Sequence, residues 1–270
     1  MTIGVLCEDP VIAGRCGAVD GVDEIYCAGA VTEGKARWIQ TFPYILRSAA
    51  DPRPLKKTSS GLPEIDPAAS GVLIRGLDGL EYLLESGYKG EIIADATLYS
   101  MNSRSVRCLL ENGISRLTAP YEIDRHSLMS RGGADKTCLV VYGRIPLMVS
   151  AQCVFLNSGS GCAVRNGEKS GNVMMIKDRK GAYLPVKRFC GECLNVIYNS
   201  VPLSLHKDIK DVLSFAPSSL RLDITTETEE EALKIVKYYV NLVRGSSTGK
   251  KEEKPPFSAY TRGHFSKGML

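Results

Sequence analysis

Residues 71–118 read GVLIRGLDGLEYLLESGYKGEIIADATLYSMNSRSVRCLLENGISRLT, and the expected architecture follows mainly from them. Short apolar runs at Val72–Arg75, Glu91–Ala94 and Arg116–Thr118 predict β-strands. Between them lie segments whose leucines recur at helical spacing, the second of which Asn102 can cap. Alternating strands and helices favour parallel strands joined by crossovers, and hence an α/β sheet or barrel.

The same strand pattern recurs outside this stretch, at Thr2–Cys7, Thr137–Tyr142 and Leu220–Ile224. After the last run, Thr226-Glu-Thr-Glu229 has the spacing of a capping box and predicts the start of an amphipathic helix. A (β/α)8 barrel of the TIM type needs eight strands and about 250 residues. Because only these strands are recognisable, we expect an α/β, TIM-barrel-like domain over residues 1–244 that is incomplete or irregular. The apolar residues of the final helix are Ala232, Ile235, Val236, Tyr239 and Val240.

Three stretches interrupt the alternation. Residues 51–70 are rich in proline and predict a surface loop. Residues 153–199 predict a cysteine-rich insertion after a late barrel strand, with a hairpin of Val173–Lys177 and Ala182–Val186 around a turn that ends at Gly181. Residues 245–256 predict a flexible linker, and the aromatic residues beyond it predict a tail, 257–270, that docks back onto the domain.

The composition describes a chain that can bury a core, with 44% hydrophobic and 24% charged residues in 270. A net charge of +4 neither requires nor excludes a polyanionic partner. No apolar run approaches the roughly 20 residues of a membrane span, so we expect no membrane among the partners. The amino terminus lacks the pattern of a signal peptide, and we therefore expect a cytoplasmic protein with reduced thiols.

Four of the nine cysteines are crowded into the predicted insertion, as Cys153, Cys162 and the pair Cys190 and Cys193. A Cys-x-x-Cys pair can present two thiolates to one metal, and two more cysteines complete the ligand set of structural zinc or of an iron–sulfur cluster. Buried, reduced thiols are the alternative. The other five cysteines are predicted to be small core residues: Cys7, Cys16, Cys27, Cys108 and Cys138.

Arg144 follows an apolar strand, and at the carboxyl end of a barrel strand it would face the active-site mouth. Asp95, Glu122 and Asp223 occupy comparable positions, where a carboxylate could transfer protons or anchor Arg144. Helix capping or loop closure is the simpler interpretation of each acid. A group of cations around the cysteine region could hold an anionic substrate or be an ordinary solvated surface: Lys177, Arg179, Lys180, Lys187 and Arg188.

Familiar catalytic motifs are absent from the sequence. The three histidines, His126, His206 and His264, form neither the helical metal pair of a zinc protease nor part of a nucleophile elbow. No glycine-rich phosphate loop or dinucleotide fingerprint follows a strand.

Taken together, several segments resemble the collagenase-like peptidase family U-thirty-two. These are Val141-Tyr-Gly-Arg-Ile-Pro-Leu-Met148, the four cysteines of the insertion, and Tyr260-Thr-Arg-Gly-His-Phe265. The resemblance extends from Val72 onward. It implies a (β/α)8 barrel with a cysteine-rich excursion, and a chain that is the carboxyl-terminal portion of a longer protein or needs a partner chain.

The resemblance implies two competing activities. The family carries a peptidase label, whereas other members support oxygen-independent hydroxylation of RNA bases or of a quinone precursor and hold a 4Fe-4S cluster on four cysteines. By this likeness Cys153, Cys162, Cys190 and Cys193 are expected to be the cluster ligands.

The leading hypothesis is therefore an iron–sulfur enzyme that hydroxylates bases in RNA, either tRNA or rRNA, or acts on a small anionic metabolite. In it, Arg144 and the cations of the insertion hold an anion, and Glu122 or Asp95 moves protons. The alternatives are a collagenase-like peptidase, which is a hydrolase, and a noncatalytic binding module stapled by zinc.

Overall fold

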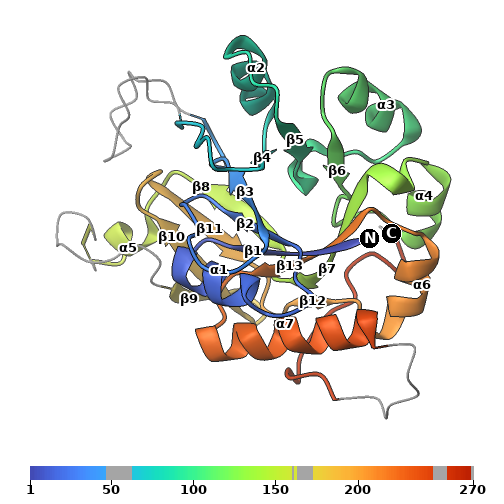
Figure 1. The fold of residues 1–270 in the computed structure, drawn as a ribbon. Helices are drawn as coiled ribbons and strands as arrows, with labels where there is room; N and C mark the ends of the chain where they lie inside the picture. Colours follow the sequence, from blue (N-terminus) through green and yellow to red (C-terminus); the bar gives the residue numbers. More distant parts are fainter. Residues whose placement is uncertain (47–62, 160, 163–172, 246–253, 269–270) are drawn as a thin grey trace.

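Eight parallel strands close into a barrel in the computed structural model, which describes residues 1–46, 63–159, 161–162, 173–245 and 254–268 (Figure 1). The last strand of the barrel, β13, pairs with β1 on one side and with β7 on the other, and β7 also pairs with β6, which closes the sheet. The strands are β1 (Thr2–Cys7), β2 (Glu24–Cys27), β3 (Arg37–Thr41), β4 (Gly71–Ile74), β5 (Glu91–Ala94), β6 (Arg116–Thr118), β7 (Thr137–Gly143) and β13 (Ser219–Ile224).

The expectation of an incomplete barrel is wrong, because β2 and β3 supply the two strands that the sequence did not reveal. Both are short and carry charged or polar residues, and Glu24 of β2 is buried. The segment between them, residues 28–36, contains no helix, so the strand–helix alternation that predicts a barrel is interrupted here.

Helices cover the outside of the barrel (Figure 1). The longest, α7, begins at Glu229, and its capping box is formed by Thr228 and Glu231, two residues later than the sequence predicts. All five apolar residues predicted for this helix are buried. The helices are α1 (Pro10–Gly17), α2 (Leu77–Glu85), α3 (Ser103–Glu111), α4 (Arg125–Ser130), α5 (Val154–Asn157), α6 (Ile209–Ser214) and α7 (Glu229–Arg244), with short 3₁₀ turns η1 (Ala96–Leu98), η2 (Ala134–Lys136) and η3 (His206–Asp208).

The inside of the barrel is filled by side chains of alternating strand positions. Gly4 makes room for the ring of Tyr26, because a Cβ at Gly4 would lie 2.7 Å from Tyr26 Cε2. Around this ring pack apolar side chains from four strands: Leu6, Ile39, Leu73 and Ile93.

Charged side chains seal the amino-terminal end of the barrel. Glu24, which is 1% exposed, accepts hydrogen bonds from Arg116, Arg37 and the hydroxyl of Tyr26. Glu91 bonds the same two arginines. Charged residues at this end of a TIM barrel contribute to stability, because the chemistry of this fold takes place at the opposite end.

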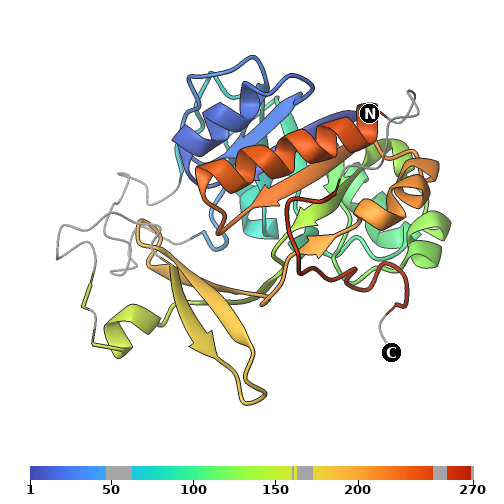
Figure 2. The same ribbon diagram turned by 90° about the horizontal axis from the view of Figure 1, so that it is seen from below.

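A second sheet stands beside the barrel, built from the chain between β7 and β12 (Figure 2). It is antiparallel, in the order β8-β11-β10-β9, and the predicted hairpin is confirmed by the pairing of β9 with β10. Its strands are β8 (Pro146–Ser150), β9 (Val173–Lys177), β10 (Tyr183–Phe189) and β11 (Leu194–Tyr198), after which the short β12 (Leu203–Ser204) pairs with β7.

The carboxyl-terminal segment from residue 254 to 268 lies against the barrel domain. Thr261 bridges to Leu203, Phe265 is buried in the main core, and the ring of Phe257 lies 5.3 Å from that of Tyr142. Most of the predicted proline-rich loop and of the predicted linker lie outside the described residues.

Among the residues that the structure describes, no helix is long and apolar enough to cross a membrane. Four of the five cysteines predicted to be core residues are buried, but Cys108 is exposed on α3, which corrects the prediction for that residue.

Candidate active site

A pocket opens at the carboxyl ends of the barrel strands, the end where TIM barrels carry their active sites. The space between its lining residues, counted together with the open solvent at its mouth, is about 430 Å³. Charged side chains and tyrosine rings dominate its polar lining: Glu8, Arg75, Asp95, Arg144 and Asp223, with Tyr44, Tyr121 and Tyr198.

Two buried arginines share one carboxylate at the base of this pocket. Asp95 lies between them, with Oδ2 3.2 Å from Nε of Arg75 and Oδ1 2.8 Å from Nη2 of Arg221. Burial by itself would raise the pKa of Asp95, but the guanidinium groups of Arg221 and Arg75 outweigh it and hold this pKa below its ordinary value. Asp95 is therefore an anion at neutral pH, and it fixes both arginines.

Arg75 is held on all sides, since it also bonds Glu8 and the carbonyl oxygen of Phe42 and lies 4.1 Å from the ring centre of Tyr44. Unlike Asp95, Glu8 accepts a hydrogen bond from only one described residue, Arg75, at 3.0 Å. The side chain of Glu8 is 14% exposed. Glu8 is thus the carboxylate of this pocket that a bound molecule can reach.

Asp223 is fixed by Arg221 and by a tyrosine. Arg221 donates to both carboxylate oxygens, at 2.7 and 3.0 Å, and Tyr121 donates its hydroxyl proton to Oδ2 at 2.9 Å. Burial and the nearby charge of Asp223 raise the pKa of Tyr121 well above 10, so its hydroxyl stays protonated. Gly143 permits the approach of β7 at this point, because a Cβ there would lie 2.6 Å from Cβ of Asp223.

Arg144 lines the same pocket but is held differently. Its Nε donates to Oγ1 of Thr226 at 3.0 Å, and Nη1 donates to the carbonyl oxygens of Asn199, at 3.0 Å, and Ser200. Within the described part of the chain it forms no ion pair, and its Nη2 has no hydrogen-bond acceptor. The guanidinium is fixed by neutral oxygens and keeps its charge uncompensated at close range.

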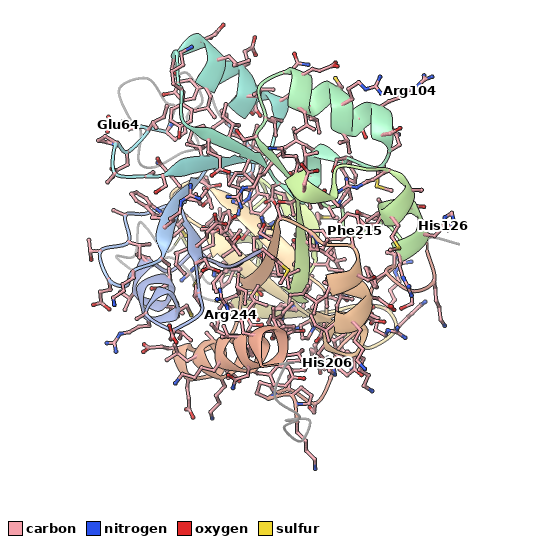
Figure 3. The ribbon with its side chains drawn as sticks, turned by 45° about the vertical axis from the view of Figure 1, so that its right-hand side comes forward. Glu64, Arg104, His126, His206, Phe215 and Arg244 are labelled. Atoms are coloured by element: carbon pink, nitrogen blue, oxygen red, sulfur yellow. The ribbon has the colours of Figure 1, made fainter. Side chains whose placement is uncertain are left out.

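The structure brings together some of the predicted site residues and not others. Asp95, Arg144 and Asp223 share the pocket; Asp95 and Arg144 directly follow β5 and β7, whereas Asp223 lies within β13. Glu122 is half-buried but does not line the pocket; the side chain that enters from this loop is its neighbour Tyr121. None of the three histidines lines it either: Figure 3 shows His126 on the outer surface and His206 near α7.

The predicted cationic cluster is divided, because successive residues of a strand point to opposite faces. Lys187 does not line the pocket but bonds a residue that does, since its Nζ donates to the carbonyl oxygen of Thr225 at 2.8 Å. Arg188 is buried on the other face with its guanidinium 4.6 Å from the ring centre of Phe155. The other three cations are exposed at the β9–β10 turn: Lys177, Arg179 and Lys180.

The four cysteines of the predicted insertion are half-buried, and none of them forms a disulfide. Cys190 and Cys193 close a turn, with the amide of Cys193 bonded to the carbonyl oxygen of Cys190 at 3.3 Å. Asn195 pairs with Ser150 and bonds the carbonyl oxygen of Gln152, which puts Cys153 at the same end of the sheet as that turn. Among the described residues, however, no three histidine, cysteine or acidic side chains are grouped to hold a metal ion.

The sequence did not identify several residues of the pocket, among them Glu8, Arg75 and Arg221. Glu8 and Arg75 each lie directly at the carboxyl end of a predicted strand, which is the signal that could have found them. Arg221 was concealed within the predicted strand Leu220–Ile224, where an arginine and an aspartate two residues apart point to the same side of the sheet.

No family model matches the sequence, and no match is found among curated proteins. A solved structure, the C-terminal domain of a presumed chitinase from Desulfitobacterium hafniense DCB-2, is 11% identical, with a TM-score of 0.38, and the match covers 90% of this chain and 99% of that domain. So low a similarity supports no conclusion about fold or function.

Proposed function

We propose that the protein is an enzyme whose active site is the pocket at the barrel mouth and whose substrate carries a carboxylate or phosphate group. The strongest support comes from Arg144. Its guanidinium lies beside the pocket, is fixed by neutral oxygens and forms no ion pair with a described residue. Its Nη2, which has no acceptor among the described residues, is the group left to donate to an oxyanion.

The carboxylates of the pocket divide into two roles under this proposal. Asp95 and Asp223 keep the two buried arginines charged and oriented, and both are engaged by two or more donors. Glu8 has one hydrogen-bond partner among the described residues and is partly open to solvent, which makes it the group that transfers a proton to or from the substrate. The hydroxyl of Tyr121 positions Asp223.

The chemistry that we propose is the one implied by the likeness to family U-thirty-two, oxygen-independent hydroxylation of an RNA base or of a quinone precursor. A 4Fe-4S cluster, when bound, would supply electron transfer. The four thiols match its ligand set in kind, and Cys153, Cys190 and Cys193 share one end of the sheet. Because the described residues form no three-ligand group, no step of the mechanism is assigned to a metal.

Anion binding tests the proposal. A thermal-shift screen of inorganic phosphate, pyrophosphate, malonate and adenosine monophosphate should identify at least one ligand, and calorimetry then gives its Kd. We expect Arg144→Gln to weaken this Kd by about tenfold or more, because a charge-assisted pair is lost. Arg179→Gln is the matched control, since Arg179 is an exposed arginine of the β9–β10 turn. Equal Kd values for the two variants would refute the role of Arg144.

A further inference from the structure

The β9–β10 hairpin is apolar where a surface hairpin should be polar. In an antiparallel pair, directly opposite residues share one face, so Met175, Tyr183 and Lys177 lie on the same face of the hairpin. On this face Val173 is 41%, Met175 53% and Tyr183 56% exposed. The alternation of exposed polar and buried apolar residues that marks a solvated sheet is missing here.

The opposite face of the hairpin is apolar as well. It carries Met174, Ile176 and Leu184, which are half-buried, and on the same face β8, the edge strand at the other side of the sheet, carries Met148 at 56% exposure. Four consecutive apolar residues in β9, a strand at the edge of its sheet, are typical of a strand covered on both faces. In Figure 2 the β9–β10 hairpin (gold) extends away from the barrel.

The turn that joins the two strands is basic. Lys177, Arg179 and Lys180 are exposed, and the one acid of the turn, Asp178, accepts hydrogen bonds from the amides of Lys180 and Ala182 at 2.8 Å each. The carboxylate of Asp178 is thus held in the turn. An apolar hairpin therefore ends in a cluster of three cations.

We propose that the β9–β10 hairpin docks the protein on the surface of an anionic lipid bilayer. A bilayer can cover apolar side chains on both faces and along the edge of a projecting hairpin, whereas a rigid protein partner covers one face. Lys177, Arg179 and Lys180 would then lie at the level of the lipid phosphates. The sequence predicts no membrane partner because it contains no apolar run long enough to span a bilayer. A hairpin that docks on the bilayer surface does not need a spanning segment.

Other occupants fit the hairpin less well. A second copy would bring two basic turns onto one apolar interface, where like charges oppose association. Single-stranded nucleic acid requires exposed aromatic rings for base stacking, and the one exposed ring on this hairpin, Tyr183, already lies 5.5 Å from the ammonium group of Lys177.

Vesicle flotation tests the proposal with the full chain. We expect binding to vesicles of phosphatidylcholine with 30% phosphatidylserine and little to phosphatidylcholine alone, with loss of binding at high salt (on the order of 0.5 M). Met175→Ser with Tyr183→Ser, and separately Lys177→Gln with Arg179→Gln and Lys180→Gln, should each weaken binding by about tenfold or more. Leu77→Ser with Leu84→Ser on α2, and Arg104→Gln with Arg107→Gln on α3, are matched controls that alter equally exposed residues.

A second readout reports on the hairpin itself. The chain has one tryptophan, Trp38, which is buried at 7% exposure, so Tyr183→Trp adds a reporter at the docking surface. Its emission should shift to shorter wavelength on anionic vesicles and not on neutral ones. Absence of vesicle binding, binding that the hairpin variants leave unchanged, or an unshifted emission would each overturn the proposal. So would dimerisation or oligonucleotide binding that the same variants abolish while vesicles do not bind.

Discussion

Arg221 and Asp95 are 126 residues apart in the sequence, and their side chains meet inside the barrel with Nη2 of Arg221 2.8 Å from Oδ1 of Asp95. Arg221 is 1% exposed and also pairs with Asp223, while Asp95 also pairs with Arg75. This chain of buried charges joins β4, β5 and β13 at the barrel mouth. It gives the pocket a rigid floor to which Arg144 and Glu8 add the groups that face a ligand.

Asp95→Asn should destabilise the protein by about 3 to 5 kcal/mol, because the substitution leaves two buried guanidinium groups without their shared anion. Urea unfolding followed by circular dichroism gives the change in the free energy of unfolding. Glu230→Gln is the control, since the pair of Glu230 with Lys234 is exposed to solvent and its loss should leave the free energy of unfolding almost unchanged. A similar small loss for both variants would contradict the network's role.

The stability that Asp95 contributes should depend on pH in one direction. Its pKa in the folded protein is below its ordinary value of 3.8, so its contribution is complete at pH values well above 3.8 and is lost as the pH falls through the lower, folded-state pKa. The difference in unfolding free energy between wild type and Asp95→Asn should therefore be constant at neutral pH and shrink under acidic conditions. A difference that grows on acidification would show that the sign is wrong.

Glu24→Gln should distinguish the role of the charged network at the amino-terminal end of the barrel from that of the network at the mouth. Glu24 accepts bonds from Arg116, Arg37 and Tyr26 while 1% exposed, so its loss should destabilise the protein by about 3 kcal/mol. Because this network lies at the amino-terminal end of the barrel, the Kd for the anion found in the screen should stay unchanged in the folded variant. A weakened Kd would contradict the assignment of the site to the mouth.

Much of the barrel could be predicted from the sequence because its strands and helices have clear periodicity. Thr2–Cys7, Glu91–Ala94 and Arg116–Thr118 have the predicted bounds, since each is an apolar run with a turn signal after it. β2 and β3 could not be predicted, because Glu24 and Arg37 point into a charged network whose partners come from distant strands. Local periodicity contains no information about such partners.

The candidate site was predictable to the same extent. Asp95 and Arg144 were singled out because polar residues directly after barrel strands converge at the mouth. The sequence also favours Glu122 as a residue of the site. Only the conformation of the loop after β6 determines that its neighbour Tyr121 enters the pocket instead. Lys187 and Arg188 of the predicted cationic cluster lie on opposite faces because both belong to β10, in which successive side chains alternate.

Metal analysis tests the part of the proposal that rests on the cysteines. Protein purified without oxygen should contain iron and sulfide and absorb near 400 nm, roughly as thiolate-ligated clusters do. Cys190→Ser with Cys193→Ser should abolish both, whereas Cys108→Ser, which alters an exposed cysteine on α3, should leave them unchanged. Zinc in place of iron would favour the structural-module alternative, and a metal content that the double variant retains would refute the ligand assignment.

The most direct test of the central claim is the position of a bound anion. Crystals soaked in selenate, whose anomalous scattering locates the selenium atom, should show a peak within about 4 Å of Nη2 of Arg144 in the wild type, the distance of a guanidinium–oxyanion pair. The peak should be absent from Arg144→Gln crystals soaked in the same way. Selenate bound only at the β9–β10 turn, or bound in the pocket equally in both proteins, would contradict the claim that Arg144 anchors an anionic substrate.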